Sequence, residues 1–178
     1  MKYQAKANKK GETLIEVIAA LTSLVLAGIA VMTLIISVMN STAISKEYLI
    51  AQNLAREGME GVTNIRDTNW LLYPSKKTDC WMIIDSSACL GTQPVINEDY
   101  RLAKTASGNF KLEKSVLWDD TLKSNDYFKI QSQPAFYRKI EFTQIDSDTA
   151  QVTVTVAWMN KSTVTKYELS SVLVNYEK

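Results

Sequence analysis

The sequence contains no histidine and only two cysteines among its 178 residues. The absence of histidine removes the general base of the usual catalytic triads and the commonest metal ligand in proteins. No pair of carboxylates is marked as catalytic by its sequence setting, and no glycine-rich phosphate-binding loop is present. We therefore expect a protein that is not an enzyme and that binds no cofactor or metal ion.

A large excess of charge of one sign is also lacking. The 20 lysines and arginines nearly balance the 19 acidic residues, which leaves a net charge of +1. Proteins that bind nucleic acid need a basic surface, because phosphate contacts supply most of their affinity. No nucleic-acid partner is therefore expected. The chain length and the 46% share of hydrophobic residues are sufficient for one domain with its own core.

The hydrophobic residues are concentrated near the N-terminus. From Val17 to Met39, 23 residues follow one another without a charge. A helix of this length spans a hydrocarbon core of about 30 Å. Residues 1–11 contain four lysines and no acid, so the N-terminus should stay in the cytoplasm and the chain after Met39 should lie on the opposite side. We predict a single-pass protein of the cytoplasmic (inner) membrane.

Two simpler interpretations of this segment remain open. It could be a cleaved secretory signal peptide, with Gly28 and Ala30 as the small residues of a cleavage site. It could also be an uncleaved anchor with no further role. The apolar run continues beyond Ala30 to Met39, which disfavours cleavage there. In a plain anchor, Glu16 would simply lie close enough to the membrane interface to stay hydrated. A carboxylate inside a membrane is costly, however, and by default indicates a function.

The stretch KKGETLIEV, Lys9 to Val17, together with the apolar run resembles the class III signal of type IV pilins and type II secretion pseudopilins. The resemblance implies that a prepilin peptidase cleaves after Gly11 and that the new N-terminal amine of Glu12 is methylated. It also implies that Glu16 guides the addition of subunits to a helical filament. The family most often has phenylalanine after the cleavage site, and a polar residue there is more like minor pilins. We therefore expect a minor pilin, with a type II secretion pseudopilin as the alternative.

An electrostatic argument also assigns Glu16 a role in subunit assembly. After cleavage, Glu12 would carry a free ammonium, and Glu16 would lie one helical turn away. In a medium of low dielectric constant an ammonium and a carboxylate attract strongly, and either charge alone is heavily penalised. An unpaired Glu16 would therefore favour docking against the amine of a neighbouring subunit.

The resemblance also implies the partners of the chain. These are other pilins or pseudopilins, the prepilin peptidase, and the assembly platform of a pilus or secretion system. The membrane would be contacted through residues 17–39. A third interpretation comes from a different class of protein, namely a membrane-anchored receptor or adhesion domain that never assembles. It predicts an uncleaved N-terminus and no dependence on Glu16.

Apolar residues recur at spacings of three and four through residues 40–68, which predicts an amphipathic helix continuous with residues 12–39. The stripe consists of Ile44, Tyr48, Ala51, Leu54, Ala55, Met59, Val62 and Ile65, and charged residues, among them Arg66, occupy the remainder. Gly58 and Gly61 lie in or beside the stripe and favour close approach to another element. The stretch AREGMEGVTNIRD is similar to the end of the first helix in PilV-like minor pilins and I-type pseudopilins.

Residues 69–178 are expected to form an extracytoplasmic globular domain whose first part, residues 73–133, is irregular. Three later segments are rich in β-branched and aromatic residues and predict an antiparallel meander. These segments are residues 136–145, 151–159 and 163–176. The predicted fold class is α+β, with a long N-terminal helix packed against a C-terminal antiparallel sheet, as in pilins.

The middle segment of the meander shows a clear alternation. Its valines and Trp158 occupy every second position, and Thr153, Thr155 and Ala157 lie between them. One face of the sheet should therefore be buried against the apolar stripe of the helix. The turns are expected at residues 146–148 and 160–162.

Cys80 and Cys89 are separated by eight residues. Outside the cytoplasm they should form a disulfide, which would contribute about 2–3 kcal/mol by the loop-entropy model. Free thiols are the alternative, and two thiols without histidine make a poor metal site. Asp119, Asp120, Asp146 and Asp148 could suggest a calcium site, but no EF-hand pattern is present. We interpret them as turn-forming residues.

Overall fold

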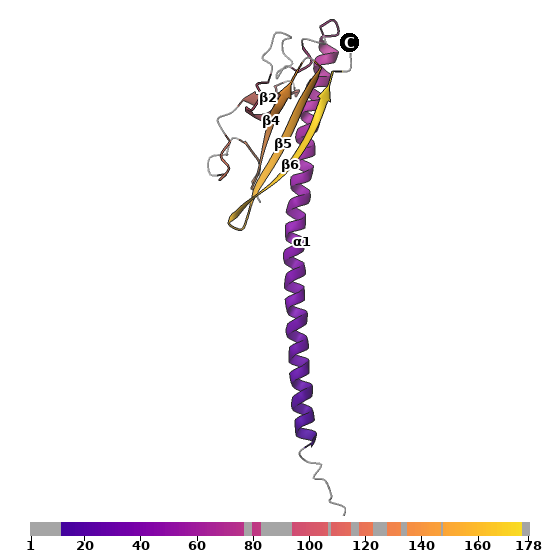
Figure 1. The fold of residues 1–178 in the computed structure, drawn as a ribbon, viewed down its shortest axis with the longest axis vertical. Coiled ribbons are helices and arrows are strands. Elements are labelled where there is room, and N and C mark those ends of the chain that lie inside the picture. The colour runs from indigo at the N-terminus through magenta and orange to yellow at the C-terminus, as the bar shows by residue number, and fades with distance from the viewer. Residues whose placement is uncertain are drawn as a thin grey trace, which may run out of the picture. The chain divides into compact units, whose positions relative to one another are not determined.

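The computed structural model describes residues 12–76, 80–82, 94–106, 108–114, 118–122, 128–132, 135–146 and 148–175. A single helix, α1 (Glu12–Leu72), precedes six strands (Figure 1). The strands are β1 (Asp99–Lys104), β2 (Phe110–Lys114), β3 (Lys129–Ser132), β4 (Ala135–Ile145), β5 (Thr149–Asn160) and β6 (Thr163–Val174). The predicted α+β class is confirmed. The chain divides into two compact units, an N-terminal unit up to Lys46 and a C-terminal unit from Glu47.

No described part of the chain packs against the helix of the N-terminal unit. Residues 13–46 are all exposed. The most apolar window of α1 has a mean hydropathy of 2.4 and is 0% buried, so the helix is long and apolar enough to cross a membrane. Its hydroxyl groups bond to the preceding turn: Thr22 Oγ1 donates to Ile18 O at 2.5 Å, and Ser23 Oγ to Ala19 O at 2.8 Å. Such bonds make polar side chains tolerable in lipid.

In the C-terminal unit, α1 packs on one face of the sheet (Figure 1). The core contains Ala51, Ala55, Val62 and Ile65 of the helix, and Phe136, Ile140, Phe142, Val152, Val154, Val156 and Trp158 of β4 and β5. The predicted stripe is thus confirmed from Ala51 onward, whereas Ile44 and Tyr48 are exposed.

Arg66 differs from the expected pattern. It is only 8% exposed because its guanidinium lies over the Trp70 ring, 4.7 Å from the centroid.

The two glycines of the stripe lie where the helix and the sheet are closest. A Cβ on Gly58 would lie 2.9 Å from Val154 Cγ1 and 3.0 Å from Arg138 Cδ. A Cβ on Gly61 would collide with the Leu102 side chain of β1. The predicted close approach is therefore confirmed, and it explains why two poor helix formers occur in the middle of α1.

The sheet is antiparallel with the strand order β2-β1-β4-β5-β6, and β3 also pairs with β4. The strands β4, β5 and β6 correspond to the three predicted segments. The expectation that residues 73–133 are irregular was wrong for β1, β2 and β3, which lie within that range. In β1 and β2 an apolar residue alternates with a charged one, as at Tyr100 and Leu102 and at Phe110 and Leu112, but over too few positions to indicate a strand. These strands owe their conformation to pairing with β4 and with each other.

The expectation of a single buried face was also incomplete. Thr155 is 3% exposed and Ala157 is 0% exposed, although both point away from α1. A second apolar cluster covers that face, formed by Leu122, Phe128, Tyr137 and Ala157, with Trp118, Ala135 and Val164 packed against it. The sheet is therefore covered on both faces near the β5–β6 turn.

Candidate functional site

The candidate site is the first two turns of α1. The helix begins at Glu12, the residue that cleavage after Gly11 would make N-terminal. Gly11 and the rest of residues 1–11 lie outside the described residues, so the leader stays a prediction. Glu16 lies one turn after Glu12 and is exposed. Its carboxylate takes part in none of the ion pairs found among the described residues.

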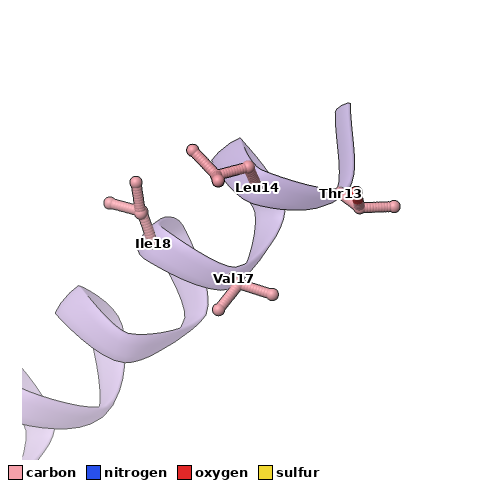
Figure 2. A pocket seen from close by; sticks show the side chains of 4 residues that line it. All are labelled: Thr13, Leu14, Val17 and Ile18. Carbon is pink, nitrogen blue, oxygen red and sulfur yellow. The ribbon is translucent and has the colours of Figure 1, made fainter. Parts of the chain in front are cut away.

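The same two turns carry an apolar surface. Figure 2 shows Thr13, Leu14, Val17 and Ile18 pointing outward and lining a shallow pocket on the helix. At 3.6 residues per turn, these positions fall within an arc of about 140° around the helix axis. Position 16 lies about 130° from the centre of that arc. The start of α1 therefore has an apolar side suited to lipid or another helix and a separate position where a carboxylate can accept a cation.

The cysteine pair is described only in part. Cys80 is 0% exposed, and the backbone N–H of Cys80 donates to Lys76 O at 3.1 Å. Cys89 lies outside the described residues. The disulfide between Cys80 and Cys89 therefore stays a prediction.

Asp119 and Asp146 form turns, as predicted. Asp146 Oδ1 accepts hydrogen bonds from Thr149 N at 2.7 Å and from Asp148 N at 3.0 Å, which closes the β4–β5 turn. Asp119 Oδ1 accepts Thr121 N at 2.8 Å in the same way. Within the described parts of the chain, no group of three or more acidic or cysteine side chains is close enough to hold a metal ion.

Asp120 has a different role. Its Oδ1 accepts a hydrogen bond from Lys166 Nζ at 2.6 Å, and this bond lowers the pKa of the Asp120 carboxyl below its ordinary value of 3.8. The pair joins the segment that follows β2 to strand β6. Both side chains are exposed, and ion pairs at the surface contribute little to stability.

A buried arginine that sequence analysis missed ties α1 to the sheet. Arg138 occupies an inward-facing position of β4, and its Nη1 donates to Leu54 O of α1 at 2.8 Å. The same atom lies 3.3 Å from Glu57 Oε2. Burial lowers the pKa of the guanidinium, and Glu57 opposes that shift. The signal in the sequence was the interruption of the apolar series Phe136–Ile140–Phe142 by a charged residue.

A second missed cluster lies on the opposite face of β4. Lys139 Nζ donates to Asp99 Oδ1 at 2.8 Å and to Glu141 Oε2 at 3.0 Å. The other Asp99 oxygen accepts the backbone N–H of Trp118 at 3.0 Å. These bonds join β1, β4 and the segment that covers the outer face of the sheet. The cluster therefore holds these structural elements together.

Comparison of the chain with models of known protein families, with curated proteins and with solved structures finds no match. The function must therefore be inferred from the residues and from the arrangement of α1, the apolar run and the sheet.

Proposed function

We propose that the chain is a structural subunit of a type IV pilus-like filament, and that it is a minor pilin. The observation that carries this proposal is the order of features along one helix. A basic leader ends in Gly11, the helix begins at Glu12, a carboxylate follows at Glu16, and an exposed apolar surface extends to Met39. The C-terminal part of the same helix is covered by an antiparallel sheet, which the pilin resemblance also implies.

Processing would begin in the membrane. The basic leader would keep the N-terminus in the cytoplasm, and the C-terminal unit would lie on the extracytoplasmic side. A prepilin peptidase would hydrolyse the bond between Gly11 and Glu12, and the new amine would receive a methyl group. A methylated amine keeps its positive charge at neutral pH, so it can still pair with a carboxylate.

Assembly would use the two parts of the site separately. The Glu16 carboxylate would pair with the N-terminal ammonium of a neighbouring subunit, because neither charge is tolerated alone in a low-dielectric environment. The apolar side chains around the helix would exchange lipid for the helices of other subunits, so that little apolar surface becomes exposed to water. The C-terminal unit would then form part of the filament surface.

The mass of the intact protein tests the proposal. Protein purified from cells with an active prepilin peptidase should be lighter by residues 1–11 and heavier by one methyl group. Gly11→Val should block cleavage and leave the full-length mass. Gly28→Val is the matched control, because no heavy atom lies within 4 Å of a Cβ at Gly28, and it should be processed normally. A full-length, unmethylated wild-type protein would contradict the proposal and favour the membrane-anchored domain that never assembles.

A further inference from the structure

The turns at the two ends of β5 carry opposite charges. The β4–β5 turn contains Asp146 and Asp148, whereas the β5–β6 turn contains Lys161 and no acid. Strand β5 has 12 residues, so the two turns are about 36 Å apart. We call these the Asp146 end and the Lys161 end of the sheet.

The C-terminal unit begins at the Lys161 end. Trp158 Nε1 donates to Glu47 Oε2 at 3.0 Å. The Tyr48 ring meets the Trp158 ring edge to face, with the centroids 5.9 Å apart. The Lys161 end also exposes apolar side chains: Tyr48 is 46% exposed, Leu49 60% and Met159 45%. Its surface thus combines a lysine with an aromatic ring and two aliphatic side chains.

The link between the apolar run and the C-terminal unit is short. Only residues 40–46 separate Met39, where the apolar run ends, from Glu47. The eight steps from Met39 to Glu47 cover about 12 Å as a helix and at most about 28 Å if extended. If the apolar run crosses a membrane, this short link limits how far Glu47, and the Lys161 end that it contacts, can lie from the membrane surface.

We propose that the Lys161 end rests on the headgroup layer of anionic phospholipid. Tyrosine is favoured at the boundary between headgroups and hydrocarbon, and a lysine near the surface is attracted to anionic lipid. Two carboxylates lie toward this end. Asp120 is neutralised by its ion pair with Lys166, whereas Glu47 accepts a hydrogen bond from the uncharged Trp158 indole, which does not neutralise it. The acidic Asp146 end would be repelled by the same lipid. The proposal requires the membrane anchor and does not depend on filament assembly.

Native methionines allow the contact to be measured on the full-length chain. Three methionines lie at increasing distances from the Lys161 end. Met159 is at that end, and Met59 lies 11 residues after Tyr48 on α1. Met82 follows Trp81, whose carbonyl oxygen accepts a hydrogen bond from Asn69 Nδ2 at 3.5 Å. Met59 is thus about 17 Å along the helix from Tyr48, and Asn69 about 32 Å. The protein would be placed in nanodiscs containing phosphatidylglycerol and a trace of lipid with a paramagnetic headgroup. NMR line broadening of the three methionine methyl groups would then be compared.

We expect the Met159 methyl signal to broaden strongly, Met59 weakly, and Met82 not at all. The Met159 broadening should fall in discs made only of phosphatidylcholine. Broadening of Met159 no greater than that of Met82 would overturn the proposal. Broadening that changes with the number of protein molecules per disc would also overturn it, because it would place a second copy of the chain at the Lys161 end.

A pair of charge reversals tests the role of Lys161. Lys161→Glu should remove the extra Met159 broadening that anionic lipid produces. Lys76→Glu is the matched control, since Lys76 is an exposed lysine that follows the end of α1, and it should leave the broadening unchanged. Unaltered Met59 and Met82 shifts would verify that both variants are folded. The headgroup contact would be refuted if the Met159 signal broadened equally in discs with and without phosphatidylglycerol, both for wild type and for Lys161→Glu.

Discussion

Helix α1 carries two different apolar surfaces. Between Leu14 and Met39 the large apolar side chains lie on all sides of the helix and are 45–72% exposed. In the C-terminal unit, Ala51, Ala55 and Val62 are 0% exposed. The difference lies in the spacing of the apolar residues, which is continuous in the first part and follows a three-and-four pattern in the second. The first surface has no partner among the described residues, whereas the second packs against the sheet.

This contrast separates folding from association along one helix. Substitutions in the first part should change what the chain binds and leave the C-terminal unit folded. Substitutions in the second part should change the stability of the C-terminal unit. All four tryptophans of the chain lie after residue 69, so tryptophan fluorescence reports on the unfolding of the C-terminal unit alone.

The largest effect is expected at Glu16. Glu16→Ala should be cleaved, inserted into the membrane and folded, but it should be absent from sheared filaments, because the pairing partner of the neighbouring amine is lost. Immunoblotting of filament and membrane fractions would measure this distribution. Glu60→Ala, at an exposed acid on the C-terminal part of α1, is the control and should assemble. Normal incorporation of Glu16→Ala would exclude the pairing mechanism.

The next effect concerns stability. Ile65 is 2% exposed in the core, so Ile65→Ala should lower the free energy of unfolding by about 2–5 kcal/mol through lost burial and the remaining cavity. Ile35→Ala makes the same change at a side chain that is 45% exposed. It should leave the denaturation midpoint followed by tryptophan fluorescence unchanged. A comparable loss for both variants would mean that the two parts of α1 unfold together.

A smaller effect is expected at the glycines. Gly61→Val should destabilise the C-terminal unit by about 1–3 kcal/mol, because the Leu102 side chain must move to accommodate the new atoms. Gly28→Val meets no neighbouring atom and should leave that unit unaffected. Thermal denaturation of the two variants would measure the difference. Equal stability of Gly61→Val and wild type would show that Leu102 can rearrange without cost.

The elements that sequence analysis predicted correctly are those with a long regular period. The helix stripe from Ala51 to Ile65 repeats over several turns, and strands β4, β5 and β6 contain 11, 12 and 12 residues. The short strands β1, β2 and β3 contain 6, 5 and 4 residues, too few for an alternation to be recognised. Burial of Thr155 and Ala157 was missed for another reason, because it depends on a covering segment that is distant in the sequence.

The same distinction applies to charged residues. The position of Glu16, one turn after Glu12, follows from the helical period and could be predicted. The partner Asp99 of Lys139 could not be predicted. Asp99 is 40 positions away and reaches Lys139 only through the β1–β4 register, in which Asp99 pairs with Glu141. A charged side chain within a strand gives no indication in the sequence of which distant strand will hold its partner.

Glu16 and Lys139 also differ in how their charges affect the stability of the C-terminal unit. The smallest of the predicted effects is the pH-dependent contribution of Lys139. Burial lowers the pKa of the Lys139 ammonium, but its hydrogen bonds to Asp99 and Glu141 more than offset this, so the pKa is raised above the ordinary value of 10.5. A raised pKa in the folded state means that the cluster stabilises the fold fully below that value and that this contribution is lost as the pH rises through the folded pKa.

Denaturation of wild type and Lys139→Met from about pH 8 upward would measure this contribution. Their difference in unfolding free energy should be constant to about pH 10 and should then shrink as wild-type Lys139 loses its proton. Glu16→Gln should follow the wild-type curve throughout, because Glu16 is exposed and lies outside the C-terminal unit. A difference that stays constant through this pH range would show that Lys139 stabilises the sheet by packing alone, without its charge.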